Sequence, residues 1–146
     1  MKPETHYAVL SIDSLELALP QSDVATLESA DRVDYSAGLP AQIETESGRW
    51  PVHCIGPDLA RLDEVPAGRK ICVVLHVAAG YAGILCDELR PLPASAARLH
   101  ALPLAMQVPG TALLGLLIVG TVGYALTSAP ALLQPLQDSS PLLVAA

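Results

Sequence analysis

Apolar and polar residues alternate along two neighbouring stretches near the start of the chain, as they do in β-strands. His6–Ile12 is rich in β-forming residues, and Leu15–Pro20 places leucines at every second position until Pro20 ends the pattern. The residues between the two stretches, Asp13 and Ser14, are typical of a tight turn. The pattern therefore predicts a β-hairpin over about residues 6–19.

The middle of the chain carries the clearest hairpin pattern. Arg69–Val77 is a run rich in β-branched residues, the "AAGY" that follows predicts a turn, and Ala82–Leu89 returns as a strand, giving a hairpin over about 69–89. Another strand is predicted at Gly48–Ile55, where Pro51 favours an edge or strand-entry position because proline cannot donate to a ladder.

Residues 21–29 predict a short helical turn followed by an extended segment with Val24 and Leu27 directed inward. Residues 129–136 form the last pattern, a short apolar helix.

A long uncharged stretch, Val108–Thr127, leaves two interpretations open. It is long enough to cross a bilayer as a helix of about 20 residues. Glycines interrupt it, however, and no Lys or Arg cluster flanks it. A fully buried hairpin over about 111–127, turning at Gly120–Thr121, would be equally apolar, and we favour it. The helical span remains the basis of an alternative function, a membrane-associated accessory protein.

The composition favours an all-β fold in a single domain, residues 1–146. Hydrophobic residues make up 51% of the chain, which is ample for a core, while 13 prolines and 10 glycines interrupt it too often for long helices. Seven or more short strands separated by turn residues point to a β-barrel or sandwich. Phe is absent, so Leu, Val, Ile and Ala must build the core.

The formal net charge of −7 argues against nucleic acid and against adsorption to anionic membranes as partners. After Arg98 the only charged side chain is Asp138, so that region is expected to be buried, bound to a partner or in a membrane. The first residues have no apolar leader pattern, and a cytoplasmic location is the default expectation.

His53 and Cys54 are adjacent and invite a thiol or metal hypothesis. Successive side chains of a strand point to opposite faces, so the two residues should not line one site. Cys72 and His76 share a face but lie about 13 Å apart on an extended strand. We therefore interpret these cysteines, with Cys86, as buried thiols in a reducing compartment.

Asp87 and Glu88 form an acidic pair at a strand end, and we interpret Asp87 as a residue that accepts a hydrogen bond from a loop backbone. The sequence has no G-x-G-x-x-G, Walker or G-x-S-x-G pattern. We expect no catalytic residues, no metal site and no cofactor, and hence no enzyme.

Taken in order, four segments resemble the CheW-like family. The opening "YAVLSIDSLELALPQSDVATLE" resembles the family's strand, turn and strand, and "GRWPVHCIGPDL" resembles its central strand. "ICVVLHVAAGYAGILCDEL" resembles its "VVVL…G…GLLVDEV" hairpin and is the best single match. "LLGLLIVGTVGYALTSAPALL" resembles its closing element, so the resemblance covers nearly the whole chain.

The resemblance implies two intertwined five-stranded, SH3-like β-barrels in one domain with no catalytic activity. Such proteins act as adaptors in bacterial chemosensory systems, coupling receptors to a histidine kinase through exposed barrel faces and the groove between the barrels. Related members serve pilus-driven twitching motility. The implied partners are a histidine kinase regulatory domain, a chemoreceptor-like protein, or both, with the membrane reached only through receptors.

Two positions depart from the family's pattern. The family's "N-L-R-G" turn is replaced by Glu44, Thr45 and Glu46, and the nearby Arg49 is shifted past the glycine. The family's early "V-x-E-[IV]" carries Thr26 in place of its glutamate. We interpret the chain as a divergent CheW-like domain with a changed partner. The residues predicted to bind that partner are Val24, Thr26, Leu27, Glu46, Arg49 and Trp50.

Overall fold

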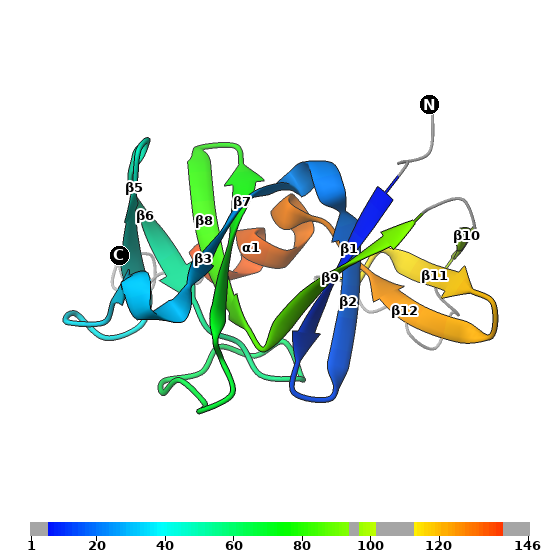
Figure 1. The fold of residues 1–146 in the computed structure, drawn as a ribbon, viewed down its shortest axis with the longest axis horizontal. Coiled ribbons are helices and arrows are strands. Elements are labelled where there is room, and N and C mark those ends of the chain that lie inside the picture. Colours follow the sequence, from blue (N-terminus) through cyan, green and yellow to red (C-terminus); the bar gives the residue numbers. More distant parts are fainter. Residues whose placement is uncertain (1–5, 94–96, 102–112, 139–146) are drawn as a thin grey trace.

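The computed structural model describes residues 6–93, 97–101 and 113–138. Both ends of the described chain build one six-stranded sheet in the order β10-β11-β12-β2-β1-β9, which we call the first barrel (Figure 1). Its strands are β1 (His6–Ile12), β2 (Leu15–Pro20), β9 (Glu88–Pro93), β10 (Ala97–His100), β11 (Gly115–Val119) and β12 (Val122–Leu126).

The intervening residues build a second six-stranded sheet in the order β3-β7-β8-β6-β5-β4, the second barrel. Its strands are β3 (Val24–Ser29), β4 (Val33–Asp34), β5 (Ala41–Thr45), β6 (Gly48–His53), β7 (Ile71–Val77) and β8 (Gly80–Cys86). Short 3₁₀ turns, Gln21–Asp23 and Ala30–Arg32, precede and follow β3. The expected fold class, two SH3-like subdomains, is confirmed, with six strands in each sheet rather than five.

A shared core joins the two barrels. It contains Leu10 and Leu17 of the first barrel, Leu75 and Ile84 of the second, and the leucines of the helix α1 (Ala129–Asp138), which lies between the sheets in Figure 1. Ser128 caps this helix by accepting a hydrogen bond from the Ala131 amide. Leu132, Leu133 and Leu136 are spaced to cover one helix face, so the short apolar helix predicted from the sequence fastens both barrels together.

The apolar segment that could have been a membrane span contains the hairpin β11–β12, with Gly120 and Thr121 at its turn. Residues 108–112 of the same stretch lie outside the described residues. Leu117 and Tyr124 face each other across the hairpin and are buried in the core of the first barrel. Within the described ranges, no helix is long and apolar enough to cross a membrane.

Two local expectations about strand positions are wrong. β6 lies inside its sheet, between β5 and β8, so Pro51 is not on an edge strand; it directly precedes Val52, where the parallel pairing with β8 begins. Leu27 is 51% exposed rather than inward. A bulge between Val24 and Thr26 places Val24 and Leu27 on the same face, but only Val24 packs against the shared core, because β3 is an edge strand.

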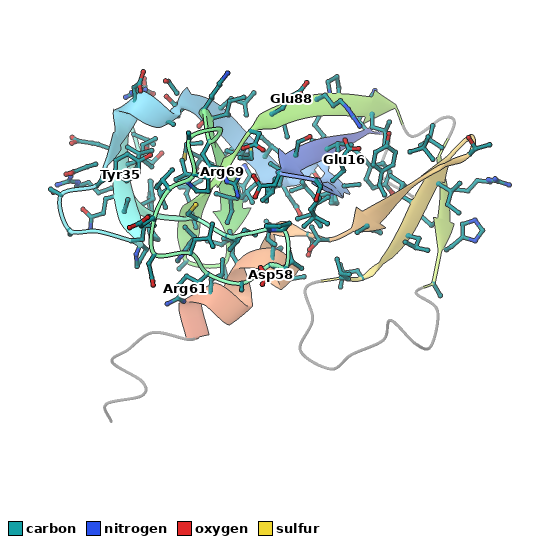
Figure 2. All side chains as sticks on the ribbon, turned by 90° about the horizontal axis from the view of Figure 1, so that it is seen from below. Glu16, Tyr35, Asp58, Arg61, Arg69 and Glu88 are labelled. Carbon is teal, nitrogen blue, oxygen red and sulfur yellow. The ribbon has the colours of Figure 1, made fainter. Side chains whose placement is uncertain are left out.

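Arg69 fastens the junction between the barrels, near the middle of the molecule (Figure 2). Its side chain is fully buried and bonds Asp13 in the β1–β2 turn at 3.0 Å, Asp87 after β8 at 2.9 Å, and the Ile55 carbonyl oxygen at 2.8 Å. Asp87 also accepts a hydrogen bond from the Asp13 amide, which confirms the interpretation of Asp87 as a backbone-binding residue. Burial alone would lower the pKa of Arg69, but the two carboxylates raise it above its ordinary value.

Candidate functional site

The second barrel is hollowed where β3 faces the tip of the β5–β6 hairpin. This hollow, which we call the mouth, has a volume of about 510 Å³. Residues from β3, β5, β7, β8 and the hairpin tip line it, among them Thr26, Glu28, Thr45, Glu46, His76 and Tyr81. The mouth combines apolar walls with charged and aromatic side chains, the mixture expected of a binding surface rather than of a sealed core.

An aromatic group forms one side of the mouth. Trp50 packs edge-on against Tyr81, with ring centroids 5.1 Å apart, and Tyr81 lies 5.3 Å from the His76 ring. The indole nitrogen of Trp50 donates to the Thr45 hydroxyl at 3.2 Å, which fixes the ring against the hairpin tip. Such half-buried aromatic residues, with rings already held in place, are the type that most often anchors a protein partner.

Arg32 bridges the opposite side of the mouth. Its guanidinium forms an ion pair with Glu28 and donates to the Glu44 carbonyl oxygen at 3.5 Å, so it links the region of β3 to β5. The side chains of Arg32 and Glu28 are 58% and 18% exposed, so solvent screens the attraction between their charges. The hydrogen bond from Arg32 to the Glu44 carbonyl oxygen is weak for a different reason, because it is long. The bridge is therefore weak enough for a partner to displace.

The structure places the six predicted partner-binding residues in different surroundings. Thr26 and Glu46 are exposed and line the mouth, and half-buried Trp50 borders it. Leu27 lies next to Thr26, on the opposite face of β3. Val24 packs against the shared core, and Arg49 is exposed and paired with Asp34 at 2.9 Å. Two of the six thus line one hollow and Trp50 packs against residues that line it, and their role in binding stays a prediction.

Sequence reasoning missed Tyr81, His76 and Arg32 as members of this site. Tyr81 and His76 are directly paired across the β7–β8 hairpin, so the register of that hairpin was the available signal. Arg32 reaches the mouth from a 3₁₀ turn through contacts with Glu28 and Glu44, and no local pattern in the sequence indicates that position.

His53, the last residue of β6, and Cys54, which directly follows that strand, are both buried. Cys54 belongs to the core of the second barrel, and burial raises the pKa of its thiol above the ordinary value. Burial likewise raises the pKa of Cys72 and Cys86 to about 12, so these thiols stay protonated. Among the described residues, no group of three or more His, Cys, Asp or Glu side chains could hold a metal ion.

The buried imidazole of His53 should make stability depend on pH. Its two ring nitrogens have no hydrogen-bond partner, and burial, helped by the charge of Arg61, lowers its pKa to about 4. In the unfolded chain the pKa returns to about 6.5, so the unfolded state takes up the proton first as the pH falls. We expect the free energy of unfolding to drop by about 2–3 kcal/mol between about pH 6.5 and pH 4 from this residue.

Urea unfolding at several pH values tests this expectation. His53→Leu should flatten the pH dependence over that window, while His100→Leu, which removes an exposed imidazole, should leave it unchanged. If the free energy of unfolding depends on pH equally in the His53 variant and the unmodified protein, His53 is not the cause of the pH dependence.

Comparison with known proteins gives a likeness to solved structures. No protein-family model matches this sequence, and no curated protein matches it. Among solved structures, the chain is similar to the scaffolding protein TtCheW from Thermoanaerobacter tengcongensis, with a TM-score of 0.67 and 12% sequence identity. The likeness covers 86% of this chain and 89% of that one. The chain therefore has the CheW-like fold that its sequence resembles.

Proposed function

We propose that this protein is a non-enzymatic adaptor of bacterial chemosensory signal transduction, serving chemotaxis or twitching motility driven by type IV pili. Its partners are a histidine kinase regulatory domain, a chemoreceptor-like protein, or both. The observation that carries the proposal is the likeness to a scaffolding protein over nearly the whole of both chains. The protein acts in the cytoplasm and meets the membrane only through its receptors.

The chemistry of the described residues agrees with an adaptor. The cysteines and His53 are buried, and the acidic residues Asp13 and Asp87 are bound to Arg69. Catalysis needs a nucleophile or base within hydrogen-bond reach of a substrate, and these groups are committed to packing or to the barrel junction. The mouth instead offers aromatic and exposed polar side chains that suit protein recognition.

Binding of the two proposed partners to the purified protein tests the function. Isothermal titration with the kinase regulatory domain and with the receptor signalling domain from the same organism should give saturable binding to at least one. Thr26→Arg should weaken that binding about tenfold or more, because it places a bulky charge in the mouth. Thr121→Arg makes the same exchange at an exposed turn of the first barrel and should leave the affinity unchanged.

The possible outcomes test the adaptor function and the role of the mouth as docking surface separately. If neither domain binds, the adaptor function is wrong. If binding occurs but the Thr26 variant binds as tightly as the Thr121 variant, the adaptor function stands and the mouth is not its docking surface. Swimming and twitching assays on a strain lacking the protein then distinguish the two pathways.

A further inference from the structure

The strand β3 leaves one backbone edge unpaired beside the mouth. It is the first strand in the sheet order β3-β7-β8-β6-β5-β4, so only its β7 side carries a ladder among the described residues. Thr26 and Glu28 of β3 line the mouth, and Leu27 between them is 51% exposed. An exposed edge of this kind can pair with an extended segment from another chain.

The register shows which backbone groups of β3 face outward. The Ala30 amide donates to the Lys70 carbonyl oxygen at 3.0 Å, and Thr26 and Glu28 pair with Val74 and Cys72 in the same register. In an antiparallel ladder, hydrogen-bonded pairs alternate with pairs whose N–H and C=O groups point away. The N–H and C=O groups of Leu27 and the N–H of Ser29 therefore point away from β7, toward the open edge, while the Ser29 carbonyl group caps the 3₁₀ turn Ala30–Arg32.

One edge strand of the first barrel, β9, is protected in a way that β3 is not. β9 contains Pro91 and Pro93, and proline has no N–H to offer an incoming strand. β3, by contrast, contains no proline and no lysine along Val24–Ser29. Its bulge lies at one end, between Val24 and Thr26, and leaves the stretch from Thr26 to Ser29 in regular register.

The charges around this edge indicate the kind of segment it would accept. Glu28 and Glu46 line the mouth against the single cation Arg32, and the exposed Glu44 lies beside them. The surroundings are therefore negative on balance. An incoming segment would place alternate side chains toward the mouth, and would gain from carrying a neutral or basic residue there.

We propose that an extended, neutral to basic segment of the partner adds to the edge of β3 as an extra strand, pairing with the backbone of Leu27 and with the Ser29 amide. This inference rests on the proposed adaptor function and names the mode of docking at the mouth. Backbone hydrogen bonds supply the affinity, and the side chains that enter the mouth supply the specificity. The Arg32 bridge to Glu44 opens when the strand enters.

Two variants of one residue test the pairing. Leu27→Pro removes an outward N–H without removing a bond to β7, whereas Leu27→Ala keeps that N–H and shortens the side chain. With whichever partner domain binds the unmodified protein, the proline variant should lose about tenfold or more in affinity. The alanine variant should lose less than about threefold, because the backbone carries the interaction. A thermal melt checks that both variants fold.

Hydrogen exchange of the backbone amides, measured by NMR on the unmodified protein, tests strand addition independently. It also provides the test if the proline variant does not fold. The Leu27 and Ser29 amides should exchange more slowly when the partner domain is bound.

If the proline variant binds the partner as tightly as the unmodified protein and these amides are not protected, strand addition is wrong while the adaptor function stands. If the amides become protected with rising protein concentration alone, the occupant is a second copy and the proposal is wrong. If neither domain binds, the adaptor function fails and this inference with it.

Discussion

Replacing Arg69 with Ala is expected to lower the free energy of unfolding by about 3–5 kcal/mol, the cost of breaking a buried ion pair by removing one partner. The Arg69 side chain is fully buried and joins Asp13, Asp87 and the Ile55 carbonyl group. Its removal leaves that carbonyl group without its donor and leaves two carboxylates close together without a cation. Because these groups come from both barrels, the loss weakens the junction as a whole.

Chemical denaturation of the variant and the unmodified protein at neutral pH measures this effect. Arg49→Ala is the matched control, because Arg49 also pairs with an aspartate but the side chains of that pair are 52% and 45% exposed. The control should cost less than about 1 kcal/mol. A loss below about 1 kcal/mol for the Arg69 variant as well would contradict the role of Arg69 at the junction.

The same variant should change the response to acid. The hydrogen bond from Arg69 holds the pKa of Asp13 below its usual value in the folded protein. A carboxylate with a lowered pKa adds stability above its unfolded pKa, and that stability is lost as the pH falls through the folded value. Without Arg69 this contribution disappears, so the decline of stability below about pH 4 should be shallower in the variant.

The local pattern of the sequence was enough to place turns and many strands, because these depend on neighbouring residues. The Asp13–Ser14 turn, the Gly120–Thr121 turn and the helix beginning at Ala129 lie where the pattern predicts them. The division into two barrels came from the resemblance. It depends on the parallel pairings of β12 with β2 and of β6 with β8, which join distant residues and leave no mark in a local window.

The candidate site was harder to predict because it depends on contacts across the fold. Leu27 was expected inside, but the bulge and the edge position of β3 leave it half exposed. The mouth itself requires the β7–β8 register, which sets Tyr81 beside His76, and the reach of Arg32 to Glu44. Thr26, Glu46 and Trp50 were proposed from the sequence and its resemblance, and the residues around them emerge only from the fold.

Replacing Gly80 with Ala is expected to lower the free energy of unfolding by about 2–4 kcal/mol, since it combines backbone strain with a steric overlap. Gly80 begins β8 with a φ of +135°, a conformation that favours glycine. A Cβ atom there would lie 2.6 Å and 2.7 Å from two carbons of the Trp50 ring. The ring must therefore shift, which would disturb its contacts with Tyr81 and Thr45 at the mouth.

Two glycines of the β11–β12 hairpin provide control variants that separate backbone strain from steric overlap with Trp50. Gly120 has a φ of +63°, and a Cβ atom added there would meet nothing within 4 Å, so Gly120→Ala should cost about 1 kcal/mol from strain alone. Gly123 has open space and no positive φ, and Gly123→Ala should stay within about 0.5 kcal/mol of the unmodified protein. Trp50 is the only tryptophan, so its fluorescence reports the mouth directly. Among the three variants, only Gly80→Ala is expected to shift the wavelength of Trp50 emission. If its emission is unchanged and its loss in free energy of unfolding equals that of Gly120→Ala, the position of Trp50 does not depend on Gly80.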